Sequence, residues 1–596
     1  MRNKIIALIL CLVLVLSMTY ALTGCFGGDE SENGDPNDTE TNKGNTDTTK
    51  PDEPDGSDTP DTPDTPDTPD TPDTPDTPDT PDTPDTPDTP DTPGATVITY
   101  IEWDGSIASG FSGGDGTESS PYEIASGAEL AYLARQVAMG NELYSAEGVC
   151  YILTENLDLC SREWSPIGSK YNISGDTDEG CTFRGSFDGN GKKIKNVKIS
   201  EAKSYYSAFG LFGEISSATL HNIDITRVDY NSSFAKETPV GGLVGSCTNS
   251  VISQCGAGGT VYAERGSAGG LIGSAKDSTI TDCSANIDIT GAYAGGLICT
   301  LTGGSIADST ATGKLYAIDA LLGSEAVIYG GGLVGFLSGA EIRRSSSSVE
   351  MSARSALFGQ DLIGAFAGKG ENSLISDSFA TGSVTLSSKS SSNGALAAGF
   401  LGNGSSTTTI QYCYSRGNVE GSNSDSLLGF AGYAVISDCY STSNVTGGYR
   451  VAAFCMGSTA TRCISFGDAS GCYASAFNSP RASVTQSPIE PNKYNSCIVF
   501  GDVIAAYTAP ATRTERNCVF YEAESNCYRA ENITATENGA AISGSELGGE
   551  AMFFDVMNSA DFYTFDEGFA LAWDFSEMDV AAYKYPRLLS EAERNG

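Results

Sequence analysis

Few residues of this sequence have the type and spacing of a catalytic centre. His221 is the only histidine, so the chain cannot supply the His-Glu-x-x-His pattern of a zinc peptidase. A histidine-dependent triad is also unsupported, because no serine or cysteine lies in a recognisable nucleophile context. His221 lies in the stretch TLHNIDIT. We expect it to be a structural residue in a turn just before a strand.

Pairs of carboxylates offer a second kind of chemistry, because glycoside hydrolysis needs two of them at a fixed separation. Asp468 with Asp502, and Asp158 with Asp188, are the candidate pairs. An outward acidic column in a repeat protein produces such pairs by geometry alone, and lyase chemistry would favour Lys or Arg beside them. We therefore expect solvated surface charge and no catalytic residue. A carbohydrate-active enzyme, either a polysaccharide lyase or a glycosidase, is the alternative.

Seventeen cysteines allow either metal binding or disulfides. Cys11 falls in an expected signal segment and Cys25 is an expected lipid site, which leaves 15. No Cys-x-x-Cys pair occurs. In the repeat described below, cysteine exchanges with serine at one position, which favours free, buried thiols. Disulfides between adjacent repeats remain the alternative, and an odd total leaves at least one thiol unpaired.

Acidic glycine loops and tyrosines complete the candidate chemistry. The loops at 115–116, 176–178 and 188–191 lack the full spaced ligand set of a calcium site, so we expect turns, and no metal or cofactor. The chain has 27 tyrosines, whose rings could stack on sugars or anchor a protein partner, although strand propensity explains any one of them equally well. The tyrosines singled out are Tyr205, Tyr206, Tyr262, Tyr412, Tyr414 and Tyr440.

One short motif returns along most of the chain and decides the expected architecture. Its central Leu or Phe recurs every 26 to 36 residues. The copies are GLFG at 210–213, GGLVG at 241–245, GGLIG at 269–273, GGLI at 295–298, GGLVG at 331–335, GAFAG at 364–368, AGFLG at 398–402 and GFAG at 429–432. Repeats of this length, rich in Gly, Ser and short β-branched runs and without a helical pattern, predict a solenoid of stacked β coils. Propeller blades would need longer units.

A second motif follows each copy and supplies a register. It ends in Cys or Ser, at Cys255, Cys283, Ser309, Ser345, Ser378, Cys413, Cys439 and Cys463, and Cys497 continues the series. The sixth residue after each is apolar, which predicts one inward column: Val261, Ile289, Leu315, Met351, Val384, Val419, Val445, Ala469 and Val503. The fifth residue is polar. It predicts an outward ladder that includes Asp288, Lys314, Glu350, Asn418, Asn444, Asp468 and Asp502.

The glycine-flanked series resembles the GLUG motif of β-helical bacterial surface proteins. The resemblance extends upstream, because WSPIG at 164–168 and FRGSFDGNGKKIKNVKI at 183–199 are similar to the first coils of such proteins. It implies an all-β, right-handed parallel β-helix at a cell surface. Some proteins with this motif resemble zinc peptidases that cleave immunoglobulins. Their chemistry needs the histidine pattern that this chain lacks, so no activity is implied.

Both ends of the solenoid should depart from the repeat, because open end coils invite edge pairing. Ser126 with Glu129 forms a capping box, an apolar face follows, and Gly140 ends the segment, which predicts a short amphipathic helix over 126–139 as the N-terminal lid. At the other end, aromatic residues between Phe553 and Trp573 predict a C-terminal lid.

The first residues predict export and lipid anchoring. An apolar run follows Arg2 and Lys4, and Leu22-Thr23-Gly24-Cys25 resembles the lipobox of bacterial lipoproteins, in which the cysteine carries the lipid. Twelve copies of Asp-Thr-Pro then fill 58–93. Such a sequence has nothing apolar to bury, so we expect a disordered, extended stalk.

These expectations divide the chain into five parts. They are a signal peptide (1–24), the lipidated cysteine and stalk (25–95), an N-terminal cap (96–145), the β-helix (146–535) and a C-terminal cap (536–596). A formal charge of -42 makes nucleic acid an improbable partner. We expect a lipid-anchored protein on the outer face of a bacterial membrane, acting as an adhesin or as a receptor for an extracellular glycan or protein.

Overall fold

The chain divides into two units, residues 1–92 and 93–596, and only the second contains described residues. The computed structural model describes residues 98–169, 182–200, 206–232, 238–318, 328–355, 361–388, 395–422, 426–477, 494–506, 518–520, 523–537, 539–542 and 550–595. The expected signal, the lipobox with Cys25, the Asp-Thr-Pro stalk, the acidic loop at 176–178 and Tyr205 lie outside the described residues.

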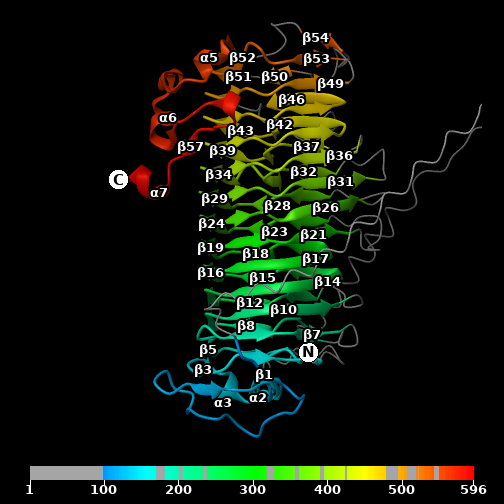
Figure 1. The fold of residues 1–596 in the computed structure, drawn as a ribbon, viewed down its shortest axis with the longest axis vertical. Helices are drawn as coiled ribbons and strands as arrows, with labels where there is room; N and C mark the ends of the chain where they lie inside the picture. Colours follow the sequence, from blue (N-terminus) through cyan, green and yellow to red (C-terminus); the bar gives the residue numbers. More distant parts are fainter. Residues whose placement is uncertain are drawn as a thin grey trace, which may run out of the picture. The chain divides into compact units, whose positions relative to one another are not determined.

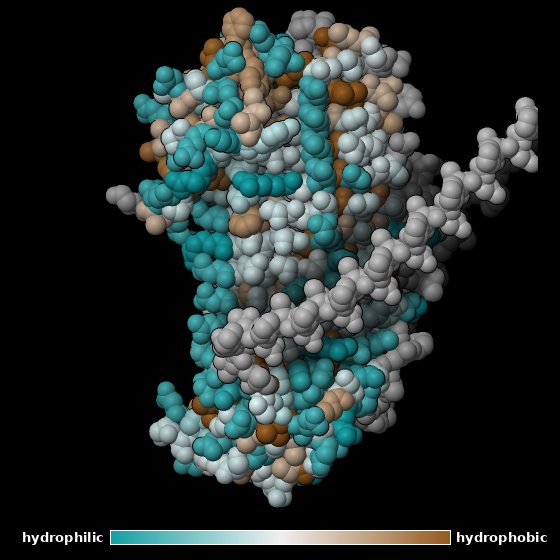
Figure 2. All heavy atoms as spheres, in the orientation of Figure 1, coloured by the Kyte–Doolittle hydropathy of each residue, from teal (hydrophilic) through white to brown (hydrophobic). Residues whose placement is uncertain are grey.

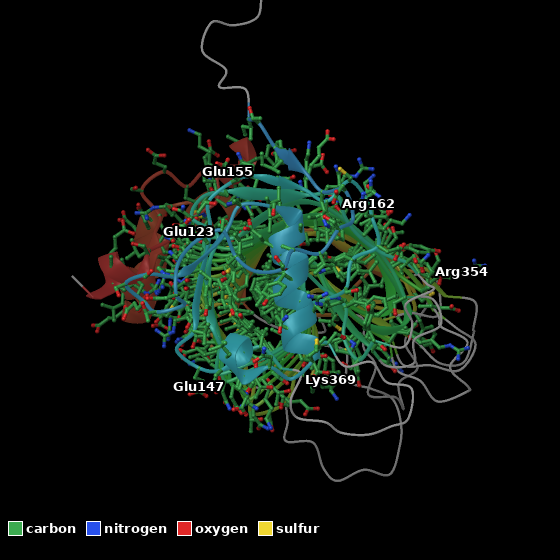
Figure 3. The ribbon with its side chains drawn as sticks, turned by 90° about the horizontal axis from the view of Figure 1, so that it is seen from below. Glu123, Glu147, Glu155, Arg162, Arg354 and Lys369 are labelled. Atoms are coloured by element: carbon green, nitrogen blue, oxygen red, sulfur yellow. The ribbon has the colours of Figure 1, made fainter. Side chains whose placement is uncertain are left out.

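A short helix closes the N-terminal end of the fold. The elements here are β1 (Ile101–Glu102), β2 (Tyr122–Ile124), α2 (Gly127–Ala138) and α3 (Glu142–Ser145). The Ser126 hydroxyl accepts a hydrogen bond from the Glu129 amide (3.3 Å), and the Glu129 carboxylate accepts one from the Ala125 amide (2.7 Å). Leu130, Leu133 and Val137 are fully buried against the first coils. The predicted helix is thus present, and Figure 3 shows it lying across the end of the coils.

Beyond this cap the chain winds into stacked coils, so that strands at the same position in successive coils pair side by side and parallel (Figure 1). One sheet contains a short strand from each coil. Its members after β2 are β3 (Cys150–Leu153), β5 (Ser186–Asp188), β9 (Thr219–His221), β13 (Val251–Ser253), β16 (Thr279–Thr281), β19 (Ser305–Ala307), β24 (Glu341–Arg343), β29 (Leu374–Ser376), β34 (Thr409–Gln411), β39 (Val435–Ser437), β43 (Thr459–Thr461), β47 (Tyr494–Asn495) and β51 (Ala523–Ser525).

The second, larger sheet begins in each coil with an arm that follows the Cys or Ser position. These strands are β4 (Leu157–Asp158), β6 (Lys193–Lys195), β7 (Val197–Ile199), β10 (Asp224–Asn231), β14 (Gly256–Gly269), β17 (Ser284–Gly295), β20 (Thr310–Thr312), β21 (Lys314–Ala317), β25 (Ser346–Ser347), β26 (Glu350–Ser355), β30 (Phe379–Ala380), β31 (Val384–Ser388), β35 (Tyr414–Ser415), β36 (Val419–Gly421), β40 (Tyr440–Ser441), β41 (Val445–Gly447), β44 (Ile464–Ser465), β45 (Ala469–Gly471), β48 (Ile498–Val499), β49 (Val503–Ala505), β52 (Tyr528–Ala530) and β53 (Ala535–Glu537).

The glycine-flanked motifs form the rest of the larger sheet, where the chain bends between two strands. Strands before the bend include β11 (Pro239–Gly241), β22 (Tyr329–Gly331), β27 (Leu362–Gly364), β32 (Leu396–Ala398), β37 (Ser426–Leu428), β42 (Arg450–Met456), β46 (Tyr473–Phe477) and β50 (Cys518–Phe520). Strands after it include β8 (Phe212–Ser216), β12 (Val244–Thr248), β15 (Ile272–Lys276), β18 (Ile298–Thr302), β23 (Val334–Ser338), β28 (Ala367–Glu371), β33 (Leu401–Asn403) and β38 (Ala431–Gly432).

The predicted inward column is present, residue for residue. Val261 pairs with Ile289, Ile289 with Leu315, and the series continues in register to Val503. All nine side chains are buried. The motif phenylalanines Phe366, Phe400 and Phe430 stack in the core with ring centroids 4.5 and 4.9 Å apart. The fold is therefore a parallel β-helix.

The aromatic C-terminal segment, residues 550–595, lies along the flank of the coils. We name this segment the strap. Its elements are β55 (Glu550–Met552), α5 (Phe554–Met557), η3 (Ala560–Phe565), α6 (Glu567–Ala572), β56 (Trp573–Asp574), η4 (Val580–Ala582), β57 (Arg587–Leu588) and α7 (Glu591–Asn595), and β54 (Ala540–Ala541) precedes it. Its rings pack on Tyr440, Phe466 and Phe500, which project from the side of successive coils. We expected this segment to form a lid over the last coil, but most of it lies along the side of the coils (Figure 1).

Candidate functional site

A concave bend runs along the β-helix where the two strands of each glycine-flanked motif meet. A Cβ atom at Gly331 would overlap the carbonyl oxygen of Val334 in the same coil, and one at Gly295 would overlap that of Ile298. The two strands therefore approach each other closely in these two coils, and there only glycine fits at the start of the bend. The central Leu333 points inward and is fully buried. This geometry explains why the motif has glycine on both sides of one large apolar residue.

Two columns of side chains form walls on either side of this bend. One wall is set by the register Pro239, Ser267, Tyr293, Tyr329 and Leu362. The other is set by Ser246, Ser274, Thr300, Phe336 and Lys369. We name the space between them the groove. Figure 2 shows surface of intermediate hydropathy on the visible face over the middle coils, as expected where Gly, Ser and Thr predominate.

Three aromatic rings gather in the middle of the groove. The Tyr293 and Tyr329 centroids are 5.9 Å apart, and those of Tyr329 and Phe336 are 5.7 Å apart. All three side chains are half-buried. They enclose a hollow of about 170 Å³ together with Ser267, Thr300 and Cys299. The lining of the hollow therefore combines aromatic rings with serine, threonine and cysteine residues.

One ammonium group lies beside these rings. The Lys369 Nζ is 5.6 Å from the Tyr329 ring centroid and 5.5 Å from that of Phe336. It pairs with the Glu371 carboxylate at 2.7 Å. Burial alone would lower the pKa of Lys369, but the bond to Glu371 raises it overall, so the group stays charged. Lys369 thus contributes a cation–π contact whose charge is already balanced.

Residues of the predicted outward ladder lie at the same position in successive coils. Several of their side chains accept hydrogen bonds from backbone amides of the next coil. The amide of Lys314 donates to the Asp288 carboxylate (3.0 Å). In the C-terminal coils, the amides of Asn444, Asp468 and Asp502 donate to the side-chain oxygens of the residues one coil earlier, Asn418, Asn444 and Asp468, at 3.2, 3.0 and 2.8 Å. Glu350 stacks in register with Lys314. The carboxylates of Asp468 and Asp502 thus serve the backbone.

The second candidate pair, Asp158 and Asp188, also makes local contacts that stabilise the fold. Asp158 accepts hydrogen bonds from the Cys160 amide and the Asn196 side chain, both at 2.8 Å, and pairs with Lys195 at 3.1 Å. Although burial opposes it, these contacts lower the pKa of Asp158. Asp188 accepts a hydrogen bond from the Asn190 amide (2.7 Å). Both carboxylates therefore hold turns.

His221 lies at the end of strand β9, which corrects the expected turn before a strand. Its Nδ1 is 3.0 Å from the Ser253 hydroxyl of the next coil, and the ring is half-buried. The turn follows at Asn222, which has a φ of 56°. These contacts fit a structural residue that joins two coils.

The surface tyrosines expected at 412, 414 and 440 do not form an open face. The strap covers them: Tyr440 is 2% exposed and lies 5.9 Å from the Trp573 ring, and Arg594 lies 3.6 Å over the Tyr412 ring. Tyr206 donates a hydrogen bond to Ser165, and Tyr262 lies on β14. The groove residues Tyr293, Tyr329 and Phe336 were missed. Aligning the two residues before each motif glycine would have found the tyrosines.

A larger cavity of about 390 Å³ lies between α2 and the first coils. Trp103, Trp164 and Arg135 are among its lining residues. The indole N–H of Trp103 donates to the Ser106 carbonyl (2.8 Å) and that of Trp164 to the Leu211 carbonyl (3.1 Å). Since both indole donors are committed to the fold, this cavity is a weaker candidate than the groove.

Over the part of the chain that the structure describes, no helix is long and apolar enough to cross a membrane. Within the same residues, no group of three or more His, Cys, Asp or Glu side chains is placed to hold a metal ion.

Comparison with known proteins identifies two copies of the GLUG motif, at residues 264–290 and 291–316. The chain is 31% identical to halomucin of Haloquadratum walsbyi over 169 residues, which are 28% of the chain and 2% of halomucin. It is 29% identical to a putative Gly-rich membrane protein of Evansella cellulosilytica over 140 residues, which are 23% of the chain and 15% of that protein. The chain thus spans only a small part of these relatives.

Two solved structures are similar at low sequence identity. An IgA1 protease matches 67% of this chain and 23% of its own, with 15% identity and a TM-score of 0.29. A putative immunoglobulin A1 protease from Bacteroides ovatus matches 81% of this chain and 96% of its own, with 16% identity and a TM-score of 0.24. Likeness at this level says nothing about activity. The stacked coils and the matched repeats together identify the chain as a parallel β-helix protein that carries the GLUG motif.

Proposed function

We propose that this protein is a cell-surface receptor or adhesin that binds an extracellular glycan or protein and does not transform it. The observation that carries the proposal is the groove, where three half-buried rings line a hollow of about 170 Å³. Aromatic rings held on a rigid sheet supply contact area at little entropic cost, which suits binding.

The positions of the carboxylates support binding over catalysis. A glycosidase needs one carboxyl group to give or take a proton and a second to act as nucleophile or base. In the Asp468 and Asp502 pair, the Asp468 oxygen accepts the amide proton of Asp502 at 2.8 Å. A carboxylate that holds the next coil in this way is poorly placed to serve a substrate.

The surface location is part of the proposal. Its support is the lipobox-like Leu22-Thr23-Gly24-Cys25 and the Asp-Thr-Pro repeat, which would hold the β-helix away from a membrane. A relative named as a putative membrane protein agrees with it. A Cys25→Ala variant should move from the membrane fraction to the soluble fraction. Retention of the variant in the membrane would contradict lipid anchoring at Cys25.

The test of function is a panel of polysaccharides and extracellular matrix proteins offered to the full-length chain. We expect saturable binding of at least one of them, without new reducing ends or unsaturated products. The Asp468→Asn and Asp502→Asn variants should bind equally well, because an amide oxygen still accepts the backbone hydrogen bond. Turnover that disappears in either variant would overturn the proposal in favour of a carbohydrate-active enzyme.

A further inference from the structure

Aromatic and hydroxyl side chains line the groove, and such groups favour some classes of ligand over others. We propose that it binds a neutral polysaccharide chain that lies lengthwise across successive coils. This inference rests on the proposed function and names the ligand class of the same site. It is carried by the rings, the hydroxyl wall, the glycine floor and the charge of the body.

The rings provide faces for sugar contact. Tyr293, Tyr329 and Phe336 are tilted by 30 to 36° from one neighbour to the next and remain half-buried, so each keeps exposed ring surface. The C–H groups of a pyranose pack on such faces, because the electron-rich face of an aromatic ring attracts their partial positive charge.

The wall that contains Phe336 provides hydroxyl groups at regular intervals in the preceding coils. Ser246, Ser274 and Thr300 occupy the same position in three successive coils, and all three are half-buried. Neighbouring coils in a parallel sheet are about 4.8 Å apart. This interval is close to the length of one sugar unit in an extended chain, so one hydroxyl could serve each unit.

The glycines at the start of each bend form the floor of the groove. They lack side chains, so a ligand can approach the backbone there, and the series of glycines stops after Gly364. Glycine occupies the first position of the bend at 241, 269, 295, 331 and 364. Apolar side chains begin to fill the bend at Leu362, in the coil of Gly364, and they pack on one another through the later coils: Leu362, Leu396, Ala398, Leu428, Ala452 and Met456. The open part therefore spans the coils that carry the rings and the hydroxyl column, as expected for a site of limited length.

The negative charge of the protein argues against a polyanion in the groove, and the pairing of its strands argues against an extended peptide. The chain remains strongly acidic even without residues 26–94, which hold 22 acidic residues and two lysines, so a polyanion would be repelled. Lys369 does not offset this, because Glu371 already pairs with it. An extended peptide would need a free strand edge. The groove offers none at Gly331, which is paired with Gly295 on one side and Gly364 on the other.

The test uses substitutions borrowed from neighbouring coils, which already accommodate them. Tyr329→Leu copies Leu362, and Phe336→Thr copies Thr300. The matched control is Tyr316→Ser, on the same coil but outside the groove, where Ser352 stands one coil later. Tyr316 is 41% exposed. Circular dichroism and thermal melting would establish that each variant is folded.

Binding is measured with soluble cello-oligosaccharides, xylan, mannan and amylose as neutral probes, and with polygalacturonate as the acidic one. We expect at least one neutral probe to bind, and the double variant Tyr329→Leu/Phe336→Thr to bind it at least tenfold more weakly, with Tyr316→Ser unchanged. Equal binding by the double variant, or a preference for polygalacturonate, would overturn this inference and leave surface binding intact. Binding of matrix proteins alone would also overturn it. A protein that binds nothing in either panel would count against both proposals.

Discussion

Single side chains hold the bend that precedes the long arm of each coil. At this bend a residue with positive φ, such as Asp282 or Asp438, is followed by Cys or Ser. The side chain donates to the carbonyl two residues earlier, over 3.1 Å from Cys439 to Ser437 and 2.7 Å from Ser378 to Ser376. It also accepts the amide of the preceding coil, as Cys439 accepts from Cys413 at 3.4 Å. Thiol and hydroxyl can both do this, which explains their exchange.

The same burial should make these thiols unreactive. Twelve cysteines, from Cys150 to Cys497, have free thiols in the part of the chain that the structure describes, and most of them are buried. Burial raises the pKa of Cys299 to about 11 and that of Cys439 well above its usual range. Since the thiolate is the nucleophile, iodoacetamide at pH 8 should label the half-buried Cys150 and Cys160 first and reach Cys439 only after unfolding in urea. Peptide mass mapping would check this. Equally fast labelling of Cys439, or a Cys413–Cys439 disulfide, would contradict it.

The strap is the element that distinguishes one flank of the β-helix from the others. The outward position after the Cys or Ser column carries Ser284, Thr310 and Ser346 in the middle coils and then Phe379, Tyr414 and Tyr440. The strap covers this flank from where the aromatic residues begin. Its tip is held by ion pairs: Arg344 pairs with Glu591 at 2.8 Å, and Arg594 pairs with Asp377.

Trp573 should be the main anchor of the strap. Its ring is 3% exposed, and its indole lies 3.4 Å from the Asp438 carboxylate, which also pairs with Arg462. Truncating a buried Trp costs about 3–5 kcal/mol. Trp573→Ala should therefore free the strap and speed tryptic cleavage at Lys584 or Arg587 at least tenfold, while the coils stay resistant. Leu571→Ala is the matched control, because Leu571 is 72% exposed. Unchanged cleavage of the Trp573 variant would show that other contacts hold the strap.

At the scale of the whole β-helix, each coil contacts only its neighbours, so the end coils are the vulnerable places. α2 protects the N-terminal end, where its Leu130, Leu133 and Val137 belong to the same buried cluster as Trp103, Ile124 and Trp164. The strap also has exposed apolar side chains, such as Phe553, which is 64% exposed, but these are single residues and do not form an open core. We therefore expect the cap to keep copies of the molecule apart.

Opening the N-terminal cap should cause association of the protein with itself. Leu133 is a fully buried residue of α2, so Leu133→Asp places an unpaired charge in the core at a cost of at least about 4 kcal/mol. We expect concentration-dependent association, measured by light scattering, because the first coil then offers an open strand edge and core. Met139→Asp, at a position 73% exposed, should behave like the parent protein. A dispersed Leu133→Asp variant would mean that the cap has another role.

The register of the coils could be predicted from the amino-acid sequence. The apolar column from Val261 to Val503 and the α2 capping box depend on alternation and spacing within short stretches of chain. Which outward residues are open to a ligand depends instead on how the folded chain packs. Tyr440 is covered by Trp573, 133 residues further along the chain, and the groove brings Tyr293 beside Tyr329 from the next coil, with ring centroids 5.9 Å apart. Exposure depends on such distant contacts, and local patterns do not encode them.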